Sequence, residues 1–196
     1  MGNVYKAELT NNQFLQQVDQ STFVIKQTDN EDIFKAHLFA LALAGHPFLE
    51  HIYFIFEEGD NYCIVSKYIP GNSFEYHEQS FNYYKNSRPQ LKKEQIIHIL
   101  AQLVLGLEGM HVNGISHNDI AARNILVDGD LNTKIIDYGL ADNSEPSRST
   151  DFTNLFNLFK PFLLEKSKSC ITLMDDIIHH RSSSSFLEIN QFGLEK

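Results

Sequence analysis

Three side chains with oxygen ligands occur in a fixed order in the second half of the sequence: Asp119, Asn124 and Asp137. Carboxylate and amide oxygens are the ligands that a hard cation such as Mg²⁺ prefers. Asp and Asn are also common in turns where short strands meet loops, so each residue alone has a simple structural explanation. The combination is more informative, because several independent spacings would otherwise have to coincide.

The segments around these residues are predicted to be a helix before them and a hairpin between them. Lys93 to His111 has apolar residues at the spacing of one buried helical face. These are Ile96, Ile97, Leu100, Leu103, Val104, Leu107 and Met110. Two short apolar runs, Ile125 to Val127 and Thr133 to Ile136, flank Asp128-Gly129-Asp130, and this turn composition predicts a hairpin.

The first third of the chain is predicted to be a small sheet that carries one helix. The expected strands are Asn3 to Leu9, Ser21 to Gln27, His51 to Phe56 and Tyr62 to Tyr68. A helix is expected to begin at Asp29 or Asn30 and to end before Gly45. Its apolar face would be formed by Ile33, Phe34, Leu38 and Leu41.

The strongest break in composition in the middle of the chain is Pro70-Gly71-Asn72, where strand-like periodicity gives way to helical periodicity. We therefore expect one α+β domain over residues 1–196, with a small lobe over 1–69 and a mostly helical lobe over 70–196. The last helix is expected to begin after Ser149 or Thr150, and Pro161 is expected to kink or end it. Its apolar face would be formed by Phe152, Leu155, Phe156, Phe159 and Phe162.

The overall composition argues against several classes of partner. A formal net charge of -9 disfavours a general nucleic-acid role, because phosphate backbones attract Lys and Arg surfaces. Cys63 and Cys170 are the two cysteines of the sequence, and they predict reduced thiols in a cytoplasmic protein. The sequence has no signal pattern at its start, and no stretch is expected to span a membrane.

The segment from His117 to Asn124, followed by Lys134-Ile135-Ile136-Asp137-Tyr138-Gly139, resembles the catalytic loop and the metal-binding Asp-Phe-Gly element of protein kinases. The resemblance extends from about Gly2 to Asp142. It implies a bilobal kinase-like fold with a reduced small-lobe sheet and a shortened, mostly helical large lobe. It also implies that Asp119 orients the acceptor hydroxyl and accepts its proton, while Asn124 and Asp137 hold magnesium.

The same resemblance implies an ATP site between the two lobes. Phe23-Val24-Ile25-Lys26 looks like the strand whose lysine grips the phosphates, and Val65 to Gly71 looks like the hinge. The implied catalytic residues are Asp119, Lys26, Asn124 and Asp137. The implied ATP-binding residues are Gly2, Val4, Val24, Lys26, Ser66, Lys67, Ile69 and Leu126.

The sequence departs from the kinase pattern in its helix and in its activation segment. His37 stands where the helix of the small lobe normally has a glutamate that pairs with the lysine, and Glu31 is the nearest acidic substitute in that helix. Asn118 replaces an arginine that binds phosphorylated activation loops. If the last helix begins near Asp151, most of the activation segment is missing, and Asp151 is expected to brace the catalytic-loop backbone.

Three functions are compatible with this pattern. The first is an ATP- and Mg²⁺-dependent protein kinase with an unidentified protein substrate or partner, which acts on a tyrosine, serine or threonine hydroxyl. Ala121-Ala122-Arg123 resembles the tyrosine-kinase form of the loop. The second is a pseudokinase that binds nucleotide or serves as a scaffold. The third is a kinase-like phosphotransferase for a small molecule.

Overall fold

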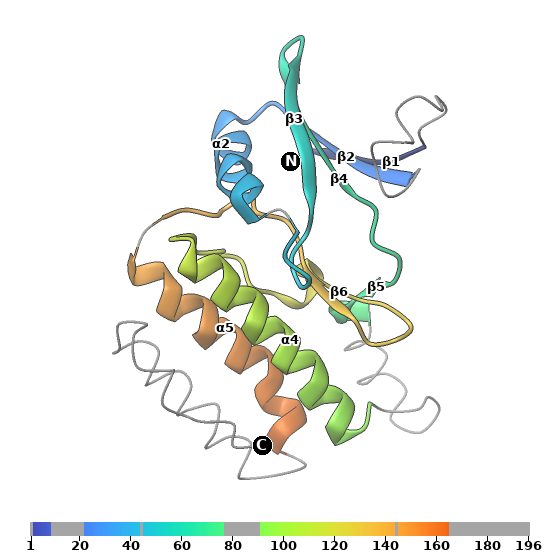
Figure 1. The fold of residues 1–196 in the computed structure, drawn as a ribbon, viewed down its shortest axis with the longest axis vertical. Helices are drawn as coiled ribbons and strands as arrows, with labels where there is room; N and C mark the ends of the chain where they lie inside the picture. The colour runs from blue at the N-terminus through green and yellow to red at the C-terminus, as the bar shows by residue number, and fades with distance from the viewer. Residues whose placement is uncertain (1, 9–21, 44, 77–90, 144, 165–196) are drawn as a thin grey trace.

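The computed structural model describes residues 2–8, 22–43, 45–76, 91–143 and 145–164. In the described part of the chain, a four-stranded antiparallel sheet with a helix beside it is followed by a three-stranded sheet and two long helices (Figure 1). The expected α+β architecture is therefore confirmed. Cys170 and the chain beyond Leu164 lie outside the described residues.

The sheet of the small lobe contains β1 (Asn3–Glu8), β2 (Thr22–Thr28), β3 (Ile52–Glu58) and β4 (Asn61–Lys67), in the order β1-β2-β4-β3. These strands agree with the predicted ones apart from small shifts at their ends. Lys26 on β2 is paired with Ile64 on β4, and Val24 is paired with Ser66. Directly paired residues point to the same face of a sheet, and so do residues two apart on one strand. Ser66 is paired with Val24, which is two residues from Lys26, so Lys26 and Ser66 share one face.

Helix α2 (Glu31–Ala40) begins where the sequence predicted, and it continues into the short helix η1 (Leu41–Leu43). The Asn30 side chain caps it by accepting hydrogen bonds from the backbone of Asp32 and Ile33. The predicted apolar face was wrong at Leu38, which is exposed. The helix instead buries Ala36, His37 and Ala40, and the two alanines allow its backbone to approach the sheet closely.

Helix α4 (Lys93–Val112) is the central helix of the large lobe and matches its prediction closely. Ile99, Leu103, Leu107 and Met110 are fully buried, whereas the predicted face member Ile97 is exposed. By length and composition the segment Glu94–Val112 could cross a membrane, so the expectation that no stretch is apolar enough was wrong. Half of this segment is buried inside the domain, and the core helix of a soluble protein can have the same length and composition.

The second sheet lies at the junction of the lobes and contains β5 (Asn72–Ser73), β6 (Ile125–Val127) and β7 (Thr133–Ile135). The expected hairpin is confirmed, because β6 and β7 pair in antiparallel register. Gly71, just before β5, has φ +123°, and a Cβ atom there would lie 2.4 Å from the carbonyl oxygen of Val127. A glycine is therefore required where the chain enters the large lobe.

Helix α5 (Glu145–Leu164) packs beside α4 (Figure 1). Its start and its end both differ from the prediction. It begins earlier than Ser149, because Pro146 fits the first turn of a helix, where its missing N–H would have no helical partner. The helix also does not end at Pro161 but continues to Leu164, and a kink at the proline stays a prediction. Phe159 and Phe162 both pack on Phe74, with ring centroids 4.9 and 5.6 Å away, and this packing outweighs the cost of the proline.

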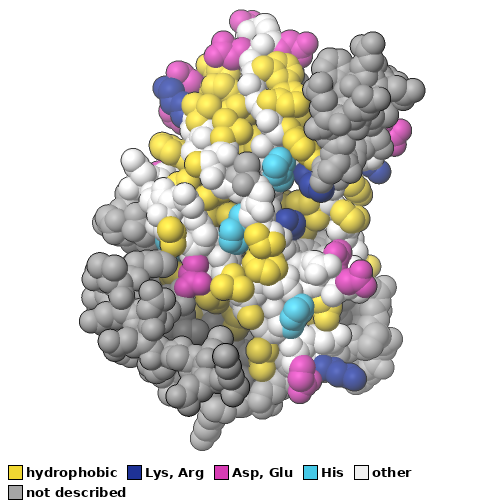
Figure 2. Space-filling model, viewed as in Figure 1, with side chains coloured by type: hydrophobic (Ala, Val, Ile, Leu, Met, Phe, Trp, Pro, Cys, Tyr) yellow, Lys and Arg dark blue, Asp and Glu magenta, His cyan; other side chains and the backbone are white. Residues whose placement is uncertain are grey.

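The surface of the small lobe carries several exposed apolar side chains, and Figure 2 shows apolar groups gathered over its upper part. Among the described residues of this lobe, the large exposed apolar ones are Val4, Tyr5, Leu38, Phe39, Phe54 and Phe56. Phe54 and Phe56 lie on the same face of the edge strand β3, with ring centroids 6.2 Å apart. The continuous core lies instead in the large lobe and at the lobe junction.

Candidate active site

The catalytic loop brings Asp119 and Asn124 into direct contact. The short helix η2 (Ala122–Asn124) turns the chain back, so that Asn124 Nδ2 donates to Asp119 Oδ2 at 2.9 Å and to the Asp119 carbonyl oxygen at 2.9 Å. Arg123 Nη2 also donates to both carboxylate oxygens of Asp119, at 2.6 and 2.7 Å. Arg123 was named from the sequence only as part of Ala121-Ala122-Arg123, and its contact with Asp119 was not predicted.

Asn124 and Asp137 offer oxygen atoms of the kind that suits magnesium. Both hydrogen bonds donated by the Asn124 side chain come from Nδ2, and among the described residues no donor meets its Oδ1. The Ile136 amide donates to the Asn124 carbonyl at 2.9 Å, which places Asp137 beside the loop. One amide oxygen and one carboxylate are hard ligands for Mg²⁺, so these residues fit the ion that the resemblance implies.

Asp137 contacts Lys26 directly through its Oδ1 atom. Burial raises the pKa of the Asp137 carboxyl, but the hydrogen bond and the positive charge of Lys26 outweigh it, and the net pKa is lowered. Asp137 has φ +66°, a left-handed conformation that Asp tolerates better than most residues. The structure therefore brings together the four residues predicted to be catalytic. Lys26 contacts Asp137, Asn124 contacts Asp119, and the hydrogen bond from the Ile136 amide to the Asn124 carbonyl joins the two pairs.

Three rings connect α2 to the catalytic loop. Tyr138 is fully buried, with the His37 ring 6.3 Å away on one side and the His117 ring 5.7 Å away on the other. Tyr138 therefore packs against the small-lobe helix. Burial lowers the pKa of His37 to about 4, although a hydrogen bond between its Nδ1 and the Ile33 carbonyl opposes the shift. His37 is therefore uncharged at neutral pH.

The helix position that normally carries the lysine's partner thus holds a neutral ring. The acidic substitute suggested by the sequence was wrong: Glu31 pairs with Lys35 at 2.8 Å on the exposed side of α2. A different carboxylate, that of Glu50 in the turn before β3, lies close to Asp137. Its Oε2 atom accepts a hydrogen bond from the Asp137 amide at 3.0 Å, and its carboxylate also bonds the side chain of Ser66.

Sequence reasoning missed Glu50 because nothing in its local pattern marks it. It follows Leu49 directly at the end of a turn, where an acidic residue is usually a solvated surface group. In the fold, burial raises the pKa of the Glu50 carboxyl, and the hydrogen bonds from Ser66 and Asp137 and the charge of Lys26 oppose that rise. Its proximity to Ser66 and Asp137 arises only from long-range contacts.

Asp151 holds the backbone of the catalytic loop from below. This fully buried carboxylate accepts hydrogen bonds from the amides of His117 and Asn118, both at 2.8 Å, and lies 2.9 Å from Nε2 of His111. The expectation that Asp151 braces the loop is confirmed. The Asn118 side chain donates to the Leu140 carbonyl at 2.9 Å, and it therefore ties the loop to the segment after Gly139.

The shortened activation segment is also visible in the geometry. The backbones of Ser116 and Asp142 exchange hydrogen bonds of 2.7 and 3.1 Å, and α5 begins at Glu145. Very little chain is therefore left between the metal-binding element and α5 for the platform that receives a peptide in a full-length kinase domain.

The residues implied for ATP binding lie on both lobes. Val24 and Ser66 are paired across β2 and β4, whereas Leu126 lies on β6 of the junction sheet. The Gly2 backbone approaches β2 so closely that a Cβ atom would lie 2.3 Å from the Gln27 carbonyl. Val4 is exposed. The Lys67 amide donates to the His51 carbonyl at 2.9 Å, and nucleotide contacts from the backbone of Lys67 and Ile69 stay a prediction.

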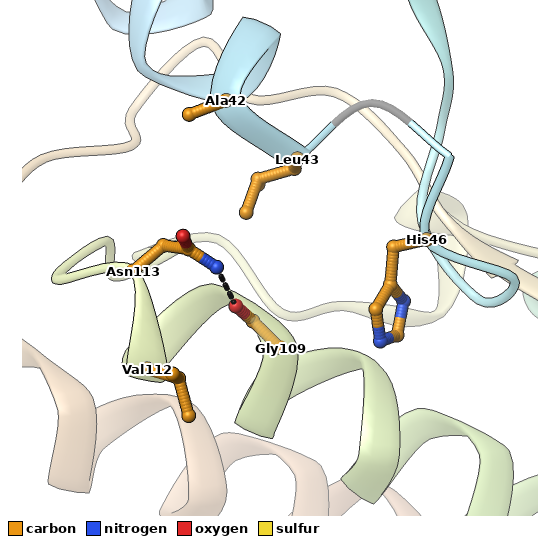
Figure 3. Close-up of a pocket in the computed structure, with 6 residues that line it drawn as sticks. All are labelled: Ala42, Leu43, His46, Gly109, Val112 and Asn113. Carbon is orange, nitrogen blue, oxygen red and sulfur yellow. Dashed lines mark hydrogen bonds between the residues drawn. The ribbon is translucent and has the colours of Figure 1, made fainter.

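A pocket of about 300 Å³ lies elsewhere, between η1 and the end of α4 (Figure 3). It is lined by Ala42, Leu43, His46, Gly109, Val112 and Asn113. A Cβ atom at position 109 would lie 2.6 Å from Nε2 of His46, so glycine makes room for this ring. None of the predicted site residues lines this pocket.

Comparison with known proteins agrees with this geometry. The model of the protein kinase domain family matches residues 2–181, and the chain therefore belongs to the protein kinase family. The kinase-like fold expected from the sequence is thereby confirmed.

Several curated kinases are similar to parts of the chain. The serine/threonine-protein kinase Nek11 of Macaca fascicularis is 34% identical over 101 residues, which cover 52% of this chain and 15% of that protein. The serine/threonine-protein kinase greatwall of Xenopus tropicalis is 27% identical over 145 residues, which cover 71% and 15%. PrkC of Bacillus subtilis, also a serine/threonine-protein kinase, is 32% identical over 115 residues, which cover 58% and 17%. The chain thus spans less than a fifth of the length of these relatives.

Proposed function

We propose that the chain is an ATP-dependent protein kinase that transfers the terminal phosphate of ATP to a protein hydroxyl. The observation that carries this proposal is the convergence of Lys26, Asp119, Asn124 and Asp137 through direct contacts. Membership of the kinase family and the names of the relatives support the same activity.

Each residue has a role that follows from its chemistry. Lys26 is a point charge suited to the phosphates next to the sugar, and Asp119 is placed to hold the acceptor hydroxyl and to take its proton. Asn124 and Asp137 would hold magnesium, which neutralises charge on the phosphates when it is bound. Arg123, which contacts Asp119 through both carboxylate oxygens, keeps that base in one orientation before the acceptor arrives.

The decisive experiment compares phosphotransfer by the purified chain with that of an Asp119→Asn variant, using labelled ATP, magnesium and a panel of protein substrates. A positioned base contributes roughly 10²- to 10⁴-fold, so the variant should lose most turnover while its thermal stability stays close to that of the parent. Asp130→Asn, on an exposed turn, is the matched control and should retain activity. Equal transfer by the parent and the Asp119 variant would refute the assignment.

The type of acceptor is decided in the same assay by identifying the phosphorylated amino acid. The similar proteins are named as serine/threonine kinases, which favours serine or threonine. The Ala121-Ala122-Arg123 form of the loop favours tyrosine. We propose serine or threonine, because similarity over much of the domain outweighs one tripeptide, and phosphotyrosine as the main product would contradict this choice.

A pseudokinase is the second candidate, and one observation favours it. In the described part of α2 no carboxylate contacts Lys26, and the lysine instead contacts Asp137, which the metal would need. A pseudokinase would bind Mg-ATP, as measured by calorimetry, without transferring phosphate to itself or to any substrate. Transfer that disappears in both the Asp119→Asn and Asp137→Asn variants would exclude this candidate.

A further inference from the structure

Lys26 is a positive charge whose usual partner is missing. Its side chain is one-fifth exposed, so it lies mostly within the protein. Nε2 of His37 on α2 lies 3.9 Å from Asp137 Oδ1, the atom that Lys26 contacts. A neutral imidazole cannot balance an ammonium group, and Glu31 is occupied with Lys35 on the opposite side of the helix. A phosphate-binding lysine without a fixed partner loses part of its value, because its position is not held before the substrate arrives.

Glu50 places a carboxylate on the same side of the sheet as this lysine. Its carboxylate bonds the side chain of Ser66, and Ser66 points to the same sheet face as Lys26, two pairs further along β2 and β4. Its Oε2 atom accepts from the amide of Asp137, the residue whose own carboxylate contacts Lys26. Two contacts therefore hold the Glu50 carboxylate on the side of the site where Lys26 forms its ion pair with Asp137, and the charge of Lys26 acts on that carboxylate.

We infer that Glu50 is a positioning residue that replaces the missing helix glutamate as the structural carboxylate partner of Lys26. This inference rests on the proposed function, in which Lys26 orients the phosphates of ATP. An ammonium group has three donors, so Lys26 can interact with Glu50 and Asp137 together. When Asp137 binds a metal, Glu50 is the nearby carboxylate that can pair with the lysine in its place.

The new partner has a different anchor from the usual one. The Glu50 amide donates to the Ile135 carbonyl at 2.8 Å, and the Glu50 carbonyl accepts from the Tyr138 hydroxyl at 3.2 Å. Both contacts belong to β7 and the metal-binding element of the large lobe. The lysine's proposed partner is therefore anchored to β7, to Tyr138 and to Ser66 on β4, and not to α2, so displacement of α2 alone would leave the pair intact.

The test measures Mg-ATP affinity, together with kcat and KM for ATP, in the full chain and in four variants: Glu50→Gln, Glu50→Asp, His37→Glu and the double variant His37→Glu/Glu50→Gln. Glu50→Gln should weaken Mg-ATP binding and lower kcat/KM by roughly 10- to 100-fold, because the lysine loses its fixed position. Glu50→Asp should retain more activity than Glu50→Gln. Glu57→Gln, an exposed substitution on β3, is the control.

Rescue separates positioning from a purely structural role. In the double variant a carboxylate returns to the helix position beside Lys26, so affinity and kcat/KM should recover by roughly tenfold relative to Glu50→Gln. A structural defect at Glu50 would not be repaired from position 37. Unchanged Mg-ATP affinity in Glu50→Gln, or a loss that His37→Glu fails to recover in a folded double variant, would overturn the inference.

A ligand-free measurement keeps the inference testable if the chain shows neither transfer nor nucleotide binding, the result that would refute the proposed function itself. In an Asp137→Asn background, where Lys26 has lost its competing partner, the melting temperatures of Lys26→Met, Glu50→Gln and the combined variant form a thermodynamic cycle. Non-additive losses support the pair of Lys26 and Glu50, and strictly additive losses contradict it.

Discussion

The catalytic loop and the lysine-bearing strand must cooperate around one nucleotide, yet they are held in very different ways. The loop rests on Asp151, a fully buried carboxylate that accepts from two backbone amides and contacts His111. Lys26 instead lies next to helix α2, none of whose carboxylates contacts it. Its lobe also has many exposed apolar side chains. The half of the site around the catalytic loop, which we call the lower half, is held by several buried hydrogen bonds. The half around Lys26, which we call the upper half, depends on a few contacts.

This difference indicates what a shortened kinase domain can lose. The buried network below the loop leaves polar groups unpaired if one member is removed, so it tolerates little change. The partner of Lys26 can be supplied from another segment, since only the position of one charge has to be kept. The geometry therefore combines a buried hydrogen-bond network under the catalytic loop with a different arrangement of charges around Lys26.

The largest expected effect is the loss of the support below the loop. Asp151→Asn replaces one acceptor oxygen with an NH₂ group that would face a backbone N–H or His111, and it leaves buried donors unsatisfied. We expect the free energy of unfolding to fall by about 3 to 5 kcal/mol, as measured by urea denaturation. Asp130→Asn, on the exposed turn between β6 and β7, should change it by less than about 0.5 kcal/mol. A loss below about 1 kcal/mol for Asp151→Asn would contradict the proposed contrast.

The second test addresses the neutral ring in α2. The pKa of His37 is about 4 in the folded chain, compared with 6.5 when it is unperturbed, so unfolding takes up a proton between these values. Stability is therefore complete above pH 6.5 and falls as the pH decreases toward 4. Linkage gives a loss of about 2 kcal/mol between pH 7.5 and pH 5 from this residue.

The control for that test is a His37→Gln variant, in which this titration is removed. His117, whose pKa is also lowered by burial, contributes in the same direction in both proteins, so the difference between their pH slopes isolates His37. Urea denaturation at several pH values gives both slopes. If the two slopes are equal, the His37 ring is not held neutral by burial, and the upper half of the site is better solvated than the structure indicates.

Most of the fold and the lower half of the site were predictable from local sequence. Periodicity identified α4 and the strands, and the turn residues marked the hairpin of β6 and β7. The order of Asp119, Asn124 and Asp137 indicated the site because these residues lie near one another along the chain. The prediction that Asp151 braces the loop came from the resemblance to the kinase pattern.

The features that were missed all depend on tertiary contacts. Glu50 resembles a surface residue until β4 and Asp137 are placed beside it. Leu38 fits a helical apolar face, but α2 turns its alanines and His37 toward the domain instead. Pro161 has a strong local preference to end a helix, and only the packing of Phe159 and Phe162 on Phe74 shows why α5 continues.

The smallest expected effect concerns Tyr138, the residue that joins the two halves. Tyr138→Phe keeps the ring between His37 and His117 and removes only the hydroxyl that donates to the Glu50 carbonyl at 3.2 Å. We expect the free energy of unfolding to fall by about 1 kcal/mol, the usual net value of one hydrogen bond. Tyr62→Phe, in which the ring stacks on Phe34 at the edge of the small lobe, is the control for hydroxyl removal. Because the Glu50 amide remains bonded to Ile135, the carboxylate should keep its place and Mg-ATP affinity should change by no more than about threefold. A much larger loss of affinity at unchanged stability would show that the upper half of the site is held mainly through Tyr138.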